Sequence, residues 1–168
     1  QFVFSGKAHP KDEGGKQLIR DIFASAGEVA NEIPVAFIEN YDMDTGLAMT
    51  SGVDIWLNNP IRPLEASGTS GMKAAMNGVP NCSILDGWWP EGCEHGVNGW
   101  AIGGAEDERD DARDAENIYN VLEHEVLPRW DEGPERWAKL MRASIATSAR
   151  FTGARMIADY LHFYDRFA

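Results

Sequence analysis

The spacing of apolar and polar residues divides the chain into a first part that alternates strands with helices and a second part that is helical. Short apolar runs predict strands, and apolar residues three and four positions apart predict helices. The predicted strands cover residues 2–4, 35–38, 53–57, 81–85 and, at an edge of the sheet, 98–102. The predicted helices between them cover residues 16–26, 44–50 and 70–77. Strands that alternate with helices at this spacing indicate a parallel sheet with helical crossovers.

Glycine and proline residues predict where several helices begin and end. Gly27 is expected to end the first helix and Gly78 the third, because glycine readily adopts the left-handed conformation that closes a helix. Pro128 is expected to end a helix over residues 112–127. Pro134 is expected to open the next helix, at a position where its missing N–H costs no hydrogen bond.

The apolar stripes of these helices are expected to form the core of the fold rather than to line a cofactor site. In the first part, the stripe comprises Leu18, Ile19, Ile22, Phe23 and Ala26. In the helix that Pro134 opens, it comprises Trp137, Leu140, Met141, Ser144, Ile145 and Ser148. In a last helix, over residues 152–163, it comprises Ala154, Ile157, Ala158 and Leu161. Cys82 lies in an apolar run and is also expected to be buried.

We therefore expect an α/β fold, with a Rossmann-like, doubly wound parallel sheet over residues 1–105 and C-terminal helices over residues 106–168. A doubly wound fold binds its ligands at the carboxyl ends of its strands. Residues 40–41 and 58–70 follow predicted strands directly, so these two segments are the first candidates for a binding site.

Composition and charge argue against several classes of function. The formal net charge of −12 argues against a protein that binds nucleic acid through its phosphates. The acidic residues between positions 106 and 116 are expected to form a solvated loop and helix start. The apolar runs are too short to span a membrane. Two cysteines and four scattered histidines indicate neither a disulfide scaffold nor a metal site. A reducing cytoplasm is therefore the expected location, and no targeting segment is visible.

The segment before the fourth predicted strand combines features that suit a ligand with a phosphate group. Gly68 and Gly71 allow the backbone to approach a ligand closely. Thr69 or Ser70 is expected to cap a helix whose free N–H groups and positive pole form an anion site. Lys73 is expected in the first turn of this helix, where a partly buried amine can condense with an aldehyde. The physical features alone leave a second interpretation open, namely a capped helix on a sheet with a surface lysine.

This segment contains the run Glu65-Ala66-Ser67-Gly68-Thr69-Ser70-Gly71-Met72-Lys73, followed by Asn77-Gly78. The run resembles the cofactor-lysine signature of the α-glucan phosphorylases, in the variant of the shorter prokaryotic enzymes. Further matches in family order are Ser5-Gly6-Lys7-Ala8, Glu39-Asn40-Tyr41, Leu57-Asn58-Asn59-Pro60, Asp86-Gly87-Trp88-Trp89 and Arg150-Phe151-Thr152. The resemblance implies that residues 1–168 are a partial C-terminal domain of a two-domain glycosyltransferase architecture, the GT-B fold.

For the cofactor, the resemblance implies that Lys73 is the catalytic lysine and forms a Schiff base with pyridoxal 5′-phosphate. Backbone N–H groups around Gly68 and Thr69 would hold the cofactor's phosphate, in agreement with the anion site expected at the helix end. Tyr41 would line the cofactor pocket. In this family the phosphate of the cofactor, rather than its ring, works beside inorganic phosphate in proton transfer to the glycosidic oxygen.

For the substrates, the resemblance implies phosphorolysis of α-1,4-glucan by inorganic phosphate, which releases glucose 1-phosphate. Glu65, with the backbone of Ala66, Ser67 and Gly68, would hydrogen-bond hydroxyls of the glucosyl unit. The complete enzyme would be a homodimer with an N-terminal domain that this chain lacks, and the chain alone would be inactive. Basic residues upstream of residue 1 would help to hold both phosphates. Arg62 would either supply part of that charge or be a surface arginine.

Two other functions stay open at this stage. The first is a nucleotide-sugar-dependent retaining glycosyltransferase of the same architecture, in which a pair of glutamates is common and the second contacts ribose. Glu65 stands at the first glutamate position and Lys73 at the second, which favours aldehyde capture over nucleotide recognition. The second is a non-catalytic glucan-binding remnant in which Trp88 and Trp89 stack on sugar rings.

Overall fold

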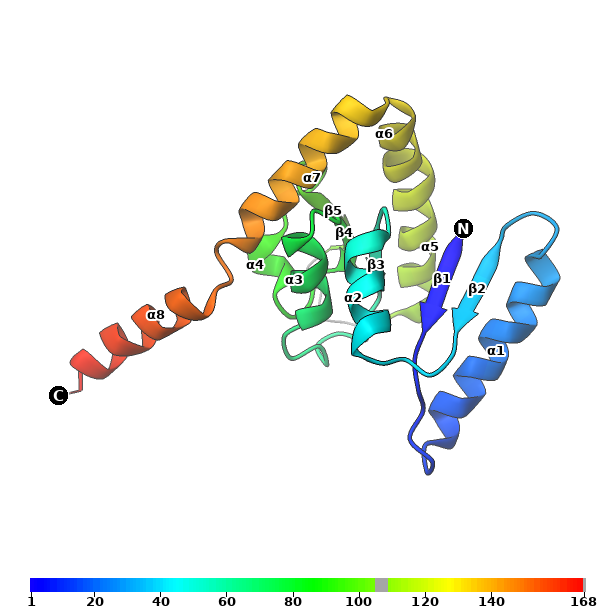
Figure 1. Ribbon diagram of the computed structural model, residues 1–168, viewed down its shortest axis with the longest axis horizontal. Helices are drawn as coiled ribbons and strands as arrows, with labels where there is room; N and C mark the ends of the chain where they lie inside the picture. The colour runs from blue at the N-terminus through cyan, green and yellow to red at the C-terminus, as the bar shows by residue number, and fades with distance from the viewer. Residues whose placement is uncertain (105–108, 168) are drawn as a thin grey trace. The chain divides into compact units, whose positions relative to one another are not determined.

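The computed structural model describes residues 1–104 and 109–167. The chain forms two compact units, Gln1–Ala48 and Met49–Ala168. Both units have parallel strands and helices, so the predicted α/β, Rossmann-like class is confirmed (Figure 1). The hydrogen-bonded strands form a two-stranded sheet in the first unit and a three-stranded sheet in the second. The predicted boundary at residues 105 and 106 and the acidic run at residues 106–108 lie outside the described residues.

The first unit is a two-stranded parallel sheet with one connecting helix. Its elements are β1 (Phe2–Ser5), α1 (Glu13–Val29) and β2 (Val35–Ile38). The two strands pair along their whole length, from Phe2↔Val35 to Ser5↔Ile38. The ring of Phe23 on α1 contacts the ring of Phe37 on β2, with the ring centroids 5.1 Å apart.

Helix α1 begins earlier and ends later than the sequence pattern predicts. The side chain of Asp12 accepts a hydrogen bond from the backbone N–H of Gly15 (2.9 Å) and so caps the helix before Glu13. Gly27 does not end the helix, because it keeps a helical backbone instead of the left-handed conformation of a C-terminal glycine. Every residue of α1 is at least partly exposed, including Leu18 at 63%, so the predicted stripe is not buried.

The second unit is built on a three-stranded parallel sheet. Its strands are β3 (Trp56–Asn58), β4 (Asn81–Ile84) and β5 (Gly99–Ile102), in the order β3-β4-β5. β5 lies at an edge, as predicted, and all four residues of the central β4 are buried. The helices between the strands are α2 (Met43–Gly52), which begins in the first unit, α3 (Thr69–Met76) and α4 (Trp89–Gly92).

The second unit continues as a series of helices. They are α5 (Asp111–Val121), the π-helical turn η1 (Leu122–Val126), α6 (Leu127–Asp131), α7 (Pro134–Ser148) and α8 (Gly153–Asp165). Pro134 opens α7, as predicted. Pro128 does not end the preceding helix. The backbone N–H of Leu127 donates to the carbonyl of Leu122, five residues back, and this wider turn accommodates the proline ring.

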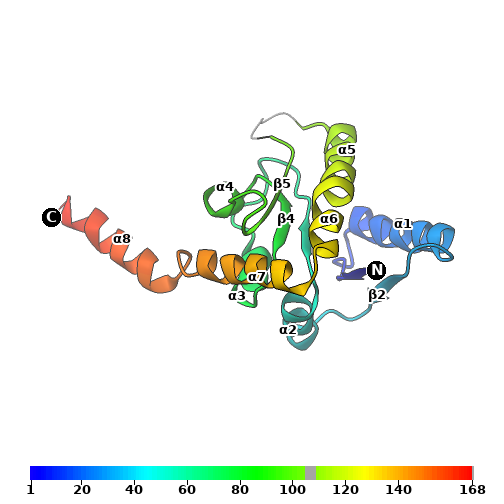
Figure 2. The ribbon, with the colours of Figure 1, turned by 90° about the horizontal axis from the view of Figure 1, so that it is seen from above.

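The two faces of β4 have different surroundings, because side chains alternate along a strand. The face with Cys82 and Ile84 contributes to the main core, which also contains Trp100, Ile102, Val121, Val126, Trp137 and Leu140. The face with Asn81 contacts α3 through a hydrogen bond to Gly71. The sheet therefore lies between α5 on one side and α3 on the other (Figures 1 and 2).

In the second unit, two further predicted stripes are less buried than expected. In α7, Met141 and Ile145 are 37% and 47% exposed, whereas the buried members of the stripe are Trp137, Leu140, Ser144 and Ser148. All of α8 is exposed, including the predicted stripe of Ala154, Ile157, Ala158 and Leu161. Figure 1 shows α8 extending away from the sheet, so its apolar side is not covered by the described residues.

Cys82 is buried, as predicted, and this burial leads to a testable dependence of stability on pH. Burial raises the pKa of the Cys82 thiol from 9.0 to about 12, and the negative charge of Glu125 adds to the effect. Burial likewise raises the pKa of Cys93 to about 12, with a contribution from Glu94.

The folded chain therefore keeps these two protons to a higher pH than the unfolded chain does. Their contribution to stability is complete below about pH 9 and is expected to fall as the pH rises toward about 12, by up to about 1.4 kcal/mol per pH unit for Cys82. Denaturant unfolding on both sides of pH 9 measures this effect. The variant Cys82→Ala should show a flatter profile, and an unchanged profile would contradict the assignment.

Candidate functional site

The loops that follow the three strands of the second unit lie at the same edge of its sheet, because the strands are parallel. Residues 59–68 follow β3, residues 85–88 follow β4, and residues 103–104 follow β5. The predicted substrate residues Glu65, Ala66 and Ser67 lie in the first of these loops, which we call the 59–68 loop. The candidate site is therefore at the carboxyl ends of the strands, where the sequence predicts it.

Asp86 joins the 59–68 loop to the loop after β4. One carboxylate oxygen of Asp86 accepts a hydrogen bond from the backbone N–H of Glu65 (2.9 Å), and the other accepts one from the N–H of Gly87 (2.8 Å). A second connection runs from the backbone N–H of Trp88 to the carbonyl of Ser67 (2.9 Å). These bonds fix the backbone of residues 65–67 against residues 86–88.

Gly87 allows the two loops to come this close. Its φ of +56° is in the left-handed region, and a Cβ atom at this position would lie 2.6 Å from the carbonyl oxygen of Ser67. In the sequence, Asp86 and Gly87 are recognisable only as part of a family match that gives them no role. An Asp-Gly pair directly after a strand, at the edge where ligands bind, is the signal that could have identified them.

Helix α3 begins with Gly68 and not with a hydroxyl cap. Gly68 has a φ of +81°, and its carbonyl accepts hydrogen bonds from the N–H groups of Gly71 (3.1 Å) and Met72 (3.4 Å). The predicted cap by Thr69 or Ser70 is wrong, because the left-handed turn at Gly68 already starts the helix. Within residues 1–104 and 109–167, the backbone N–H groups of Thr69 and Ser70 have no acceptor. They are free for an anion, as expected at a helix N-terminus.

One side of α3 packs against the sheet and the loop after β4. The side-chain amide of Asn81 donates to the carbonyl of Gly71 (3.0 Å), and a Cβ on Gly71 would lie 2.4 Å from the Asn81 amide oxygen. Ala74 and Ala75 are buried on the same side. Gly78 ends the helix with a φ of +80°, as predicted. The position of α3 is thus set by small residues that allow close contact.

Lys73 lies on the exposed side of α3. It is the fifth of eight helical residues, so the prediction that it lies in the first turn is wrong, as is the expected partial burial. The helix begins one residue earlier than predicted. The rise of 1.5 Å per residue places the Lys73 backbone only about 6 Å along the axis from Thr69. The long lysine side chain can span this distance to a ligand at the helix N-terminus. The amine has no hydrogen-bond or ion-pair partner in the part of the chain that the structure describes.

Arg62 is neither a surface residue nor a cation available to a phosphate. Its side chain is 9% exposed and forms an ion pair with Asp114 of α5 (3.0 Å). The same guanidinium donates to the carbonyl of Gly104, after β5. Its charge is therefore balanced inside the fold, which corrects both roles expected for it.

Trp88 and Trp89 are 6% and 1% exposed, so they do not form a stacking surface for sugars. The ring of Trp88 contacts Phe151 edge-on, with centroids 5.0 Å apart. The indole N–H of Trp89 donates to the carbonyl of Trp100 (3.1 Å). Both tryptophans are structural, and this removes the observation that favoured a glucan-binding remnant.

Tyr41 belongs to the first unit, in the turn between β2 and α2. Its hydroxyl lies so close to Gly46 that a Cβ there would be 2.5 Å from the oxygen. Asp42 caps the start of α2 by accepting a hydrogen bond from the N–H of Thr45 (2.8 Å), and this bond lowers the pKa of Asp42. Asn40 has a φ of +58°. The turn that carries Tyr41 is therefore a defined conformation, and the tyrosine is 42% exposed.

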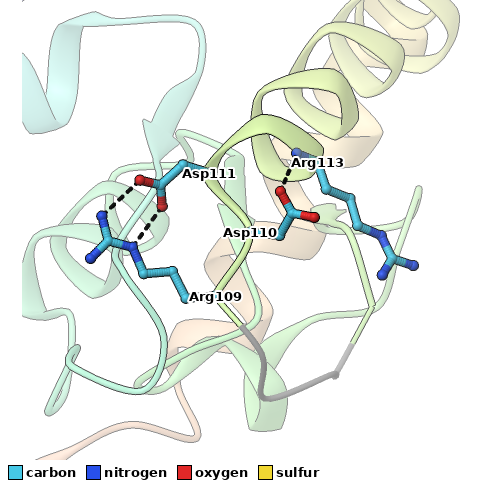
Figure 3. A pocket seen from close by; sticks show the side chains of 4 residues that line it. All are labelled: Arg109, Asp110, Asp111 and Arg113. Carbon is cyan, nitrogen blue, oxygen red and sulfur yellow. Dashed lines mark hydrogen bonds and ion pairs between the residues drawn. The ribbon is translucent and has the colours of Figure 1, made fainter.

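A pocket of about 410 Å³ lies at the start of α5 and contains none of the predicted site residues. Arg109, Asp110, Asp111 and Arg113 line it (Figure 3). Arg109 makes two hydrogen bonds to Asp111 (2.8 and 2.7 Å), which raise the pKa of Arg109 and lower that of Asp111. Asp110 caps α5 through the N–H of Arg113 (3.0 Å). The charge of Arg109 is therefore balanced by Asp111, and this pocket is not part of the predicted site.

Residues 1–104 and 109–167 contain no cluster of three or more metal-binding side chains and no helix that is long and apolar enough to cross a membrane.

The sequence is similar to carbohydrate phosphorylases. The family model "Carbohydrate phosphorylase" matches residues 1–94. Maltodextrin phosphorylase of Thermococcus litoralis is 51% identical over 98% of this chain, and glycogen phosphorylase of Aquifex aeolicus is 49% identical over 99%. Glycogen phosphorylase of Mycobacterium tuberculosis is 43% identical over 98%. The chain spans only 20–25% of the length of these relatives.

A similar fold is found in the crystal structure of the Anabaena HepE protein in complex with UDP-glucose. The TM-score is 0.64 and the sequence identity is 20%, over 95% of this chain and 40% of that one. At this identity the likeness concerns the fold alone.

Proposed function

Because this chain belongs to the carbohydrate phosphorylase family, we propose that it is the part of an α-glucan phosphorylase that binds pyridoxal 5′-phosphate through Lys73. The observation that carries the proposal is the arrangement on α3. The exposed side chain of Lys73 leaves the helix about one turn from two backbone N–H groups, at Thr69 and Ser70, that have no acceptor among the described residues. A ligand that combines an aldehyde with a phosphate fits both features.

Each residue at this edge has a distinct task in the proposal. The amine of Lys73 anchors the cofactor covalently, and the N–H groups around Gly68 and Thr69 hold its phosphate. The positive φ of Gly68 turns the chain so that these N–H groups point out of the helix end. When bound, the cofactor supplies a phosphate group that takes part in proton transfer to the glycosidic oxygen. Tyr41 lines the cofactor pocket in the complete protein.

The 59–68 loop serves the sugar. Glu65 accepts hydrogen bonds from hydroxyls of the glucosyl unit, and the backbone of Ala66, Ser67 and Gly68 supports the same unit. Asp86 holds the N–H of Glu65, so the loop is formed before the substrate arrives. A preformed loop loses less conformational entropy on binding.

The substrates of the complete enzyme are α-1,4-glucan and inorganic phosphate, and the product is glucose 1-phosphate. The proposal includes a cytoplasmic homodimer, as in the family that the sequence resembles. Three quarters or more of the length of the curated relatives lies outside this chain. The isolated chain is therefore expected to be inactive, because the rest of the cleft and the upstream cations belong to that remainder.

A nucleotide-sugar glycosyltransferase is the main rival, since the fold resembles that of a protein crystallised with UDP-glucose. The residue that distinguishes the two functions is Lys73. In the rival function, a carboxylate at this position would accept a hydrogen bond from a ribose hydroxyl. The ammonium group of a lysine cannot take over this role, because it has no acceptor.

Borohydride reduction of the complete enzyme in the presence of pyridoxal phosphate tests the proposal. We expect one label per chain, located on Lys73 by peptide mass spectrometry, and phosphate-dependent release of glucose 1-phosphate from maltodextrin. A label on another side chain contradicts the assignment. A product that requires a nucleotide sugar, without any label, supports the rival.

A further inference from the structure

Arg62 connects three segments at the carboxyl edge of the sheet. It lies in the 59–68 loop, its guanidinium donates to the carbonyl of Gly104 after β5, and it pairs with Asp114 on α5 at 3.0 Å. Asp114 is itself only 16% exposed. A guanidinium can serve two acceptors from different segments at once, because its N–H groups have a fixed planar arrangement.

The loop after β5 packs closely against α5 beside this pair. Gly103 has a φ of +70°, and a Cβ there would lie 3.0 Å from the side-chain amide of Asn117. The loop after β5 is therefore held directly under α5, next to Asp114. Removing either charge would leave the other buried without its partner, which is costly.

A tight turn connects Arg62 to Glu65, so the position of one residue constrains that of the other. The backbone N–H of Leu64 donates to the carbonyl of Ile61 (2.8 Å) and closes a turn around Arg62. The next residue, Glu65, is bound by its own N–H to Asp86. The 59–68 loop is thus held at two successive points, by α5 at Arg62 and by the loop after β4 at Glu65.

From this geometry we infer that Arg62 and Asp114 are a positioning pair, through which helix α5 fixes the sugar-binding part of the 59–68 loop. The inference rests on the proposed function, because it assigns Glu65 and the following backbone to the glucosyl unit. The pair acts on the glucan and not on the phosphates, since Asp114 already balances the charge of Arg62. Arg62 itself touches neither substrate.

Steady-state kinetics of the complete enzyme test the pair with Arg62→Lys, Asp114→Asn and the double variant. A lysine keeps the charge but cannot reach both acceptors, so the loop is expected to shift. We expect the KM for maltodextrin to rise roughly tenfold to a hundredfold, because small displacements of binding groups have effects of this size. The KM for phosphate and the label on Lys73 should not change. The double variant should be no worse than the poorer single variant, since both remove one interaction.

Arg129→Lys is the matched control. Arg129 on α6 pairs at 3.2 Å with Glu132, the residue that follows this helix, and both side chains are more exposed than those of Arg62 and Asp114. The same substitution there should alter KM by less than about twofold. A rise in the KM for phosphate in Arg62→Lys would overturn the inference in favour of a phosphate contact. A lower melting temperature with both KM values unchanged would show a merely structural pair.

Asp114→Asn preserves the shape of its side chain and provides the same test if Arg62→Lys does not fold. The two proposals fail in different ways. Absence of a label on Lys73 in the enzyme without substitutions refutes the proposed function. A normal label together with an unchanged KM for maltodextrin in both single variants refutes only the positioning pair.

Discussion

Lys73→Ala in the complete enzyme is expected to abolish covalent attachment of pyridoxal phosphate and to slow phosphorolysis at least about a hundredfold. The substitution should leave the fold intact, because Lys73 is on the exposed side of α3 and alanine is a good helix former. Borohydride labelling measures the attachment, and the release of glucose 1-phosphate measures the rate.

Two companion variants make this result specific. Lys73→Arg keeps a positive charge on α3 but cannot condense with an aldehyde, so it should lose the label and the activity together. Lys139→Ala removes an exposed lysine from α7 and should change neither quantity. Phosphorolysis at the normal rate by an unlabelled Lys73→Ala enzyme would exclude the cofactor role assigned to this lysine.

Gly87→Ala is expected to destabilise the chain by about 3 kcal/mol, through two effects that add. A φ of +56° costs an L-residue about 1–2 kcal/mol. The new Cβ would also lie 2.6 Å from the carbonyl oxygen of Ser67, and relieving that overlap must move backbone, at a typical cost of about 1–3 kcal/mol. Denaturant unfolding of the variant and the parent chain measures the difference.

Gly96→Ala separates these two effects. Gly96 has a φ of +74°, and a Cβ there would have open space, with no described atom within 4 Å. It should cost only the conformational part, about 1–2 kcal/mol. If Gly87→Ala and Gly96→Ala cost the same, the close contact between the two loops is not a source of stability.

The sequence pattern predicts the parallel α/β class and the strands of both units, because alternation of short apolar runs with helical stripes has few other solutions. It also predicts the edge of the sheet at which Glu65 and Gly68 lie. The predicted family is confirmed by relatives that match nearly the whole chain. The assigned roles of Lys73, Thr69 and Tyr41 stay predictions.

Features that depend on contacts between distant segments could not be predicted in this way. Periodicity shows that α8 is amphipathic, but it does not show whether another element covers the apolar side. The local preference of proline predicts a helix end at Pro128. In the structure, the N–H of Leu127 donates to the carbonyl of Leu122, five residues back, and this wider turn lets the helical path continue past the proline. The buried pair of Arg62 and Asp114 joins residues that are far apart in sequence, and no local pattern indicates it.

The predicted start of α3 is wrong for a local reason. Hydroxyl residues are the usual caps, and two of them stand where a cap is expected. Gly68 precedes both and begins the helix one residue earlier through its left-handed turn. A glycine directly before candidate hydroxyl caps is therefore an ambiguous signal.

The hydrogen bonds that fix residues 65–67 to residues 86–88 all use main-chain atoms of the first segment. The side chains of Ala66 and Ser67 are exposed and take no part in them. Main-chain atoms of residues 65–67 therefore fix the path of this peptide, whereas the side chains of Ala66 and Ser67 determine its chemical surface. If residues 65–68 bind the glucosyl unit as proposed, a library randomised at Ala66 and Ser67 is expected to change which sugars bind while the peptide keeps its path.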